Sequence, residues 1–139
     1  MTDLVFVYGT LKRGFRANYM LDTGIFLGEA ETPPIFRMFG SDFPWLYLAT
    51  GKDEYGWCVR GEVYEINEPT FRVLDRYEGC PGFYFRQKFT VRPLTTFKGY
   101  GEGQLNAWVY FQKPNDKWLT SAFEVLPNAE NVLVWEHQT

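Results

Sequence analysis

Glu78 is the residue of this sequence whose type and position best suit proton transfer. It lies near the end of a predicted helix, where an advance of about 100° per residue places it within roughly 60° of Phe71 and Leu74. An apolar stripe of this kind faces the core, and burial raises the pKa of a carboxyl group toward neutrality. The structural alternative is that Glu78 reaches solvent or pairs with Arg76 or Arg86.

The segment Tyr8-Gly9-Thr10-Leu11 is a second candidate, because it forms a predicted turn directly after an apolar strand. Glycine lets the backbone turn sharply and approach a ligand, and successive amide N–H groups in such a turn can bind an anion. Lys12, Arg13 and Arg16 add positive charge nearby. The segment lacks the Gly-x4-Gly-Lys-Ser/Thr pattern of a phosphate-binding loop. Taken alone, it is equally consistent with an ordinary strand-to-loop turn.

The rest of the composition argues against several other classes of function. The net charge of −3 is opposite in sign to the basic surface that nucleic-acid binding requires. Cys58 and Cys80 lack the spacing of metal ligands and the single His137 lies near the end of the chain, so we expect two reduced thiols and no metal site. No segment has the pattern of a signal peptide or the apolar length of a membrane span, which predicts a cytoplasmic protein.

Short strands and one clear helix must position these residues. Asn67-Glu68-Pro69 supplies a capping side chain and a first-turn proline, so the helix is expected to begin there and to stop at Gly79. Shorter helices are predicted over 16–21 and 118–126, and a last strand or docked tail over 132–135. The apolar or alternating patterns typical of strands cover 4–8, 24–31, 35–39, 45–49, 57–66, 83–91 and 104–112.

These elements predict one α+β domain over residues 1–139, built on a strongly curved sheet or a small barrel. The pattern does not decide whether the sheet closes into a barrel. The strand over 57–66 either changes environment along its length or carries a bulge at Gly61.

Four segments in a fixed order are more specific than any one of them. They are Tyr8-Gly9-Thr10-Leu11-Lys12-Arg13-Gly14, Gly61-Glu62-Val63-Tyr64, Leu74-Asp75-Arg76-Tyr77-Glu78-Gly79 and Phe83-Tyr84-Phe85-Arg86. Together, from Val5 to about Tyr110, they resemble the γ-glutamylcyclotransferase-like superfamily, and most closely its γ-glutamylamine cyclotransferase and AIG2-like branch.

The resemblance implies a compact mixed β-barrel with a few short helices, in which the first turn and the glutamate line one cavity. It implies that Glu78 is the general acid/base and that the backbone of Gly9, Thr10 and Leu11 binds the glutamyl group, with Tyr8 beside them. Tyr84 and Tyr110 match aromatic positions that line such cavities. Both are equally consistent with packed barrel tyrosines whose hydroxyls are satisfied locally.

The implied reaction needs no cofactor or metal. The α-amine of a γ-glutamyl amide, once deprotonated, attacks its own γ-carbonyl, so that 5-oxoproline and a free amine leave. Thr10 and Leu11 stand where the classical γ-glutamyl dipeptide branch has Ser and Asn, which favours γ-glutamylamines such as γ-glutamyl-lysine isopeptides. The alternatives are a γ-glutamyl dipeptide or glutathione-type cyclotransferase, hydrolysis to free glutamate, or a non-catalytic binding module on the same fold.

We expect a small-molecule γ-glutamyl substrate, no nucleic-acid or membrane partner, and a monomer. Whether the segment 128–139 covers the cavity is left open by the sequence, although Trp135 makes its docking on the body plausible.

Overall fold

The computed structural model describes residues 2–49, 55–80, 82–113 and 122–136. Within these ranges one α helix and one 3₁₀ helix accompany nine strands, most of them shorter than eight residues. In chain order the elements are β1 (Thr2–Val7), the 3₁₀ helix η1 (Asn18–Leu21), β2 (Ile25–Glu31), β3 (Phe36–Gly40), β4 (Pro44–Leu48), β5 (Cys58–Asn67), α1 (Glu68–Glu78), β6 (Phe85–Pro93), β7 (Leu105–Phe111), β8 (Phe123–Val125) and β9 (Val132–Leu133).

Five of the strands close into a barrel. β1 pairs with β5 in antiparallel and with β7 in parallel orientation, and the antiparallel pairs β7–β6, β6–β2 and β2–β5 complete the circle. Closure leaves none of these five strands as a free edge. The predicted α+β fold, a mixed β-barrel with few short helices, is therefore confirmed, and the open question of closure is answered.

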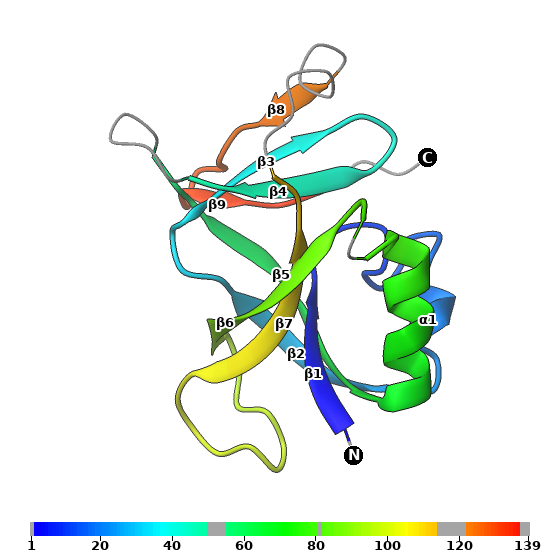
Figure 1. Ribbon diagram of the computed structural model, residues 1–139. Helices are drawn as coiled ribbons and strands as arrows, with labels where there is room; N and C mark the ends of the chain where they lie inside the picture. Colours follow the sequence, from blue (N-terminus) through cyan, green and yellow to red (C-terminus); the bar gives the residue numbers. More distant parts are fainter. Residues whose placement is uncertain (1, 50–54, 81, 114–121, 137–139) are drawn as a thin grey trace.

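The strand β1 is buried on both faces. Phe6 packs inside the barrel, whereas Val5 and Val7 pack in a second core together with Phe71 and Leu74 of α1. Figure 1 shows α1 alongside the barrel, next to β1. Burial on both sides explains why this segment is an uninterrupted apolar run rather than an alternating one.

The strands β3, β4 and β8 form a second, antiparallel sheet, which lies above the barrel in Figure 1. The Gln112 N–H, just after β7, donates to the Leu46 carbonyl of β4 over 2.8 Å and so ties the two sheets together. This arrangement brings the start of β4 to the end of the barrel where β1 finishes.

One expectation about an individual segment is wrong, and one of the two alternatives for another segment is excluded. The helix expected over 118–126 is contradicted at Phe123–Val125, which is a strand paired with β3; residues 118–121 lie outside the described ranges. The strand is favoured because Phe123 stacks on Trp135, with ring planes 9° apart. The bulge considered at Gly61 lies instead in the partner strand, between Phe26 and Gly28.

Other expectations are confirmed with small changes of boundary. The first short helix is a 3₁₀ helix confined to Asn18–Leu21, and the last strand is Val132–Leu133, paired in parallel with β5. None of the helices in the described ranges is long and apolar enough to cross a membrane.

Candidate functional site

A cavity of about 270 Å³ opens at the end of the barrel where β1 finishes. All seven residues that the sequence singled out line it: Tyr8, Gly9, Thr10, Leu11, Glu78, Tyr84 and Tyr110. The lining also includes seven residues that the sequence reasoning did not assign to a site: Phe6, Val7, Arg16, Phe43, Pro44, Tyr77 and Phe83.

The helix α1 presents Glu78 to this cavity. Asn67 caps its first turn by accepting a hydrogen bond from the Thr70 N–H over 2.9 Å, and Pro69 occupies the first turn. Gly79 ends the helix with a φ of 66°, in the left-handed region that favours glycine. The helix therefore stops directly after Glu78, so the carboxylate projects from its final turn.

The Glu78 carboxyl is mostly buried, and this burial raises its pKa from an ordinary value of 4.5 to about 7. Among the described residues, no hydrogen-bond donor or cation contacts it. The alternative pairing with Arg86 does not occur, because Arg86 binds Asp75 instead, with Nε to Oδ1 at 2.8 Å. A carboxyl group that titrates near neutral pH can both accept and return a proton during one reaction cycle.

This burial makes the stability of the protein depend on pH. Folding favours the protonated form of Glu78, so stability is lost as pH rises from about 4.5 to about 7, and the full loss of about 3 kcal/mol persists above that range. We expect Glu78→Gln to match the wild type in unfolding free energy near pH 4.5 and to exceed it by about 3 kcal/mol at pH 8. Urea unfolding across this range measures the difference. A difference that stays constant with pH would contradict the burial of the ionised form.

The turn after β1 is held by its own backbone. The Lys12 N–H donates to the Gly9 carbonyl over 3.0 Å, and the Ala17 N–H donates to the Thr10 carbonyl over 2.9 Å. Within the part of the chain that the structure describes, the N–H groups of Gly9, Thr10 and Leu11 donate to no protein acceptor. Three such donors at the cavity wall are suited to a carboxylate or to a developing oxyanion.

Gly9 is required by close packing rather than by an unusual backbone angle. A Cβ atom at this position would lie 2.4 Å from Cγ and 2.9 Å from Cδ of Pro44, which itself lines the cavity. The positive-φ glycines of the described chain do not include Gly9. The turn thus owes its position to a contact with β4, a strand more than thirty residues further along the chain.

A ring of hydrogen bonds fixes the far side of the turn. Asn18 Nδ2 donates both to the Leu11 carbonyl, over 2.7 Å, and to the Tyr64 hydroxyl, over 3.0 Å. The Tyr64 hydroxyl donates in turn to Glu62 Oε1 over 3.2 Å, and Glu62 accepts the Arg13 N–H over 2.9 Å. The Gly61-Glu62-Val63-Tyr64 motif therefore supports the turn from behind and lies outside the cavity.

The side chains of the three basic residues after the turn lie in different places. Lys12 is buried and donates from Nζ to the Trp135 carbonyl over 2.7 Å, and burial lowers its pKa. Arg13 lies over the Phe26 ring, with its guanidinium carbon 3.8 Å from the ring centroid. Only Arg16 of the three lines the cavity. No sequence signal distinguishes it from its neighbours, because the path of the loop decides which side chain turns inward.

The cavity tyrosines make specific hydrogen bonds with the protein. The Tyr8 hydroxyl donates to the Tyr110 carbonyl, and the Tyr84 hydroxyl donates to the Pro44 carbonyl, each over 2.7 Å. The Tyr110 hydroxyl donates to Asp75 Oδ1 over 2.7 Å. Tyr84 and Tyr110 were interpreted either as residues that line the cavity or as packed barrel tyrosines. The two interpretations are compatible, because each hydroxyl is satisfied locally and each residue still lines the cavity.

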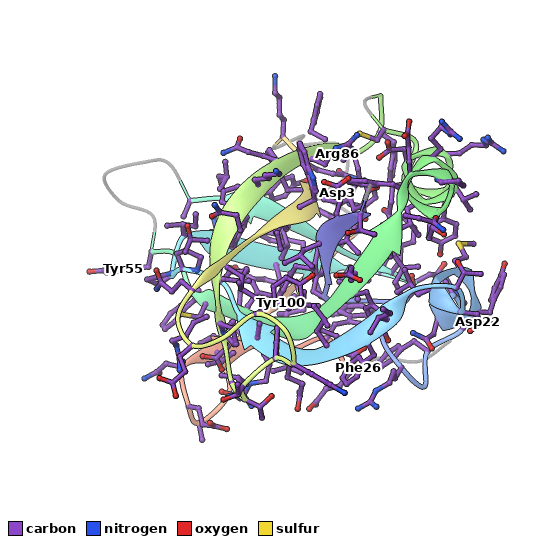
Figure 2. The ribbon with its side chains drawn as sticks, turned by 90° about the horizontal axis from the view of Figure 1, so that it is seen from below. Asp3, Asp22, Phe26, Tyr55, Arg86 and Tyr100 are labelled. Carbon is purple, nitrogen blue, oxygen red and sulfur yellow. The ribbon has the colours of Figure 1, made fainter. Side chains whose placement is uncertain are left out.

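Asp75 is held by Arg86, whose guanidinium carbon lies 4.1 Å from the ring centroid of Phe71 and 4.3 Å from that of Trp108. Figure 2 shows Arg86 on the side of the barrel that faces α1. This pair fixes the last turns of α1 against the barrel wall and so helps to position Glu78.

The described part of the C-terminal segment, 128–136, does not contribute to the cavity wall. It docks on the second sheet, where the buried Trp135 ring lies against Gly40. Residues 137–139, including His137, lie outside the described ranges. Within those ranges, no three His, Cys, Asp or Glu side chains gather into a metal-binding group.

Comparison with known proteins agrees with this geometry. The family model described as gamma-glutamyl cyclotransferase, AIG2-like, matches residues 5–125. A gamma-glutamylaminecyclotransferase from Rattus norvegicus is 40% identical over 116 residues, which cover 76% of this chain and 75% of the relative. Its counterpart from Mus musculus is 40% identical over 99 residues, which cover 65% of this chain and 64% of the relative.

A solved structure extends the agreement to the whole fold. The crystal structure of an AIG2-like protein from Mus musculus superimposes with a TM-score of 0.69 at 28% identity, covering 99% of this chain and 98% of that one. The resemblance first drawn from the four sequence segments is confirmed, and the chain belongs to the gamma-glutamyl cyclotransferase, AIG2-like family.

Proposed function

We propose that this chain is a γ-glutamylamine cyclotransferase, which releases 5-oxoproline and a free amine from γ-glutamyl amides such as γ-glutamyl-lysine isopeptides. The observation that carries the proposal is the pairing, in one cavity, of a buried carboxyl group with a turn whose amides point to the same space, where neither has a hydrogen-bond partner among the described residues. Family membership and the names of the relatives support the same activity.

The residues divide the reaction between them. Glu78 takes a proton from the substrate's α-ammonium, and the freed amine attacks the γ-carbonyl carbon of the same glutamyl group. A new C–N bond closes the five-membered ring while the bond to the leaving amine breaks. The ring nitrogen gives up a second proton in this step, and the leaving amine takes up both protons, the first through Glu78, so that it departs as an ammonium ion. The amides of Gly9, Thr10 and Leu11 bind the glutamyl group, and the walls of the cavity hold it folded, which favours ring closure over reaction with water.

The identity of the leaving amine is the finer part of the proposal. The names of the rat and mouse relatives favour an amine over an amino acid or peptide.

The test is a panel of γ-glutamyl amides incubated with the purified protein, with 5-oxoproline and free glutamate measured separately. We expect 5-oxoproline from γ-glutamyl-lysine and from γ-glutamyl alkylamines, and less from γ-glutamyl dipeptides and glutathione. Preference for glutathione would instead indicate a γ-glutamyl dipeptide or glutathione-type cyclotransferase, and release of free glutamate would indicate hydrolysis. Binding of glutamyl compounds without turnover of any of them would leave only a binding module.

Three further properties form part of the proposal. Residues 1–139 act as one domain, since the second sheet and the barrel share the hydrogen bond from Gln112 to Leu46. The protein acts as a monomer. It resides in the cytoplasm, where the free thiols of Cys58 and Cys80 stay reduced.

A further inference from the structure

We infer that the hydroxyl oxygens of Tyr84 and Tyr110 act toward the ligand only as hydrogen-bond acceptors, and that they select substrates with a free α-ammonium. The inference rests on the proposed function and adds a specificity to it: a γ-glutamyl amide is bound through its charged amine, and the corresponding glutaryl amide is rejected.

The first step is the direction of each tyrosine hydrogen bond. A tyrosine hydroxyl has one proton to donate and lone pairs to accept with. Tyr8 and Tyr84 are bonded to backbone carbonyls, of Tyr110 and Pro44, at 2.7 Å. A carbonyl oxygen can only accept, so both hydroxyl protons are committed to the protein. The Tyr8 oxygen also accepts a hydrogen bond from the Leu46 backbone N–H, so of these two hydroxyls only that of Tyr84 keeps its lone pairs for a ligand.

The hydroxyl proton of Tyr110 is also committed to the protein, in this case to a side chain. The hydroxyl lies 2.7 Å from Asp75 Oδ1, and Arg86 contacts both carboxylate oxygens of Asp75, at 2.8 and 3.2 Å. A carboxylate bound to a guanidinium by two hydrogen bonds is ionised and can only accept. The proton of Tyr110 is therefore donated to Asp75. Because the Asp75–Arg86 pair fixes this direction, the Tyr110 hydroxyl can only accept a hydrogen bond from a ligand.

The second step is that Tyr84 and Tyr110 line the same cavity as Glu78. Burial raises the pKa of Tyr84 well above 10 and raises that of Tyr110 too, and the nearby charge of Glu78 adds to each of these shifts. The phenols thus stay neutral while Glu78 titrates near pH 7. They serve as fixed acceptors, not as competing bases.

Hydrogen-bond donors and acceptors therefore lie on different walls of the cavity. The wall formed by Gly9, Thr10 and Leu11 offers N–H donors, and the wall of tyrosines and Glu78 offers acceptors. A ligand that satisfies both walls carries a carboxylate and an ammonium close together, as the α-carbon of a glutamyl group does. An ammonium held by the tyrosine oxygens also lies beside Glu78, the group that removes its proton.

The test compares two ligands that differ only in the α-amine: γ-glutamyl-ethylamide and the ethylamide of glutaric acid. Binding is measured by calorimetry to the Glu78→Gln protein, so that the first ligand is not consumed, and then to the same protein carrying Tyr84→Phe or Tyr110→Phe. We expect each added substitution to raise the Kd of the glutamyl ligand about tenfold, the effect of losing a hydrogen bond to a charged group. The Kd of the glutaryl ligand should change less than twofold.

Tyr100→Phe is the matched control, because Tyr100 bonds Glu65 away from the cavity and should leave both affinities unchanged. Competition against turnover by the wild-type enzyme, which needs no substitution, should rank the glutaryl ligand at least tenfold weaker. Equal losses for both ligands, or equal inhibition by both, would overturn the inference and leave the proposed function standing. If neither ligand binds and no 5-oxoproline forms, the proposed function fails and the inference fails with it.

Discussion

Glu78→Gln is expected to lower kcat for 5-oxoproline release by two to four orders of magnitude, roughly the contribution of a positioned general acid or base. The amide keeps the size of the side chain but cannot take the proton from the substrate's α-ammonium. Since Glu78 has no hydrogen-bond or ion-pair partner among the described residues, its replacement breaks no structural contact. The measurement is initial-rate release of 5-oxoproline at saturating substrate.

Glu68→Gln is the matched control, because this glutamate lies at the other end of the same helix and its contact with Arg72 is exposed. It should leave kcat within about twofold, as is usual for a surface substitution. Circular dichroism should be unchanged for both variants. Retention of most of the turnover by Glu78→Gln would remove Glu78 from the role of acid/base and redirect the search to another group in the cavity.

Gly9→Ala is expected to lower kcat/KM by about a hundredfold, since misplacement of a binding group by about 1 Å can have an effect of that size. The new methyl group would lie 2.4 Å from Cγ of Pro44, so that the turn, Pro44 or both must move. The Pro44 carbonyl accepts the Tyr84 hydroxyl, and displacement therefore reaches both walls of the cavity. We expect an accompanying loss of about 1–3 kcal/mol in unfolding free energy, as for other overpacked sites.

The control for this variant is Gly82→Ala, where the nearest atom to the added Cβ is the Gly79 carbonyl oxygen at an ordinary 3.5 Å. It should change kcat/KM and the midpoint of urea unfolding only slightly. If Gly9→Ala loses stability but keeps its kcat/KM, the turn contributes to folding alone and its amides do not bind the substrate.

Much of the local structure follows from the sequence. The cap at Asn67, the stop at Gly79 and the stripe of Phe71, Leu74 and Glu78 are short-range features, because the 3.6-residue period of a helix fixes which side chains share a face. The helix limits and the inward direction of Glu78 were predictable for this reason. Apolar runs and the period of two along a strand predicted most of the strands in the same way, within one or two residues.

The errors arose where local pattern was ambiguous. The segment around Phe123 contains apolar residues at spacings that suit either a helix or a strand, and its contact with Trp135 and the free edge of β3 favoured the strand. The bulge belongs to β2 rather than to Gly61, since register depends on both partners of a pair. Gly61 itself is needed because a Cβ there would lie 2.3 Å from the Val7 carbonyl oxygen.

The sequence alone determined that a carboxylate lies on the apolar stripe at the end of a helix, that a glycine turn follows an apolar strand, and that the two occur in the order typical of one family. Only the tertiary structure decided what surrounds them. The bond from Tyr8 to Tyr110 joins residues 102 positions apart, and it forms because β1 pairs with β7 in parallel to close the barrel. Closure and register are properties of the whole sheet. The polarity of the cavity wall, the contact of Gly9 with Pro44 and the burial that raises the pKa of Glu78 all depend on them.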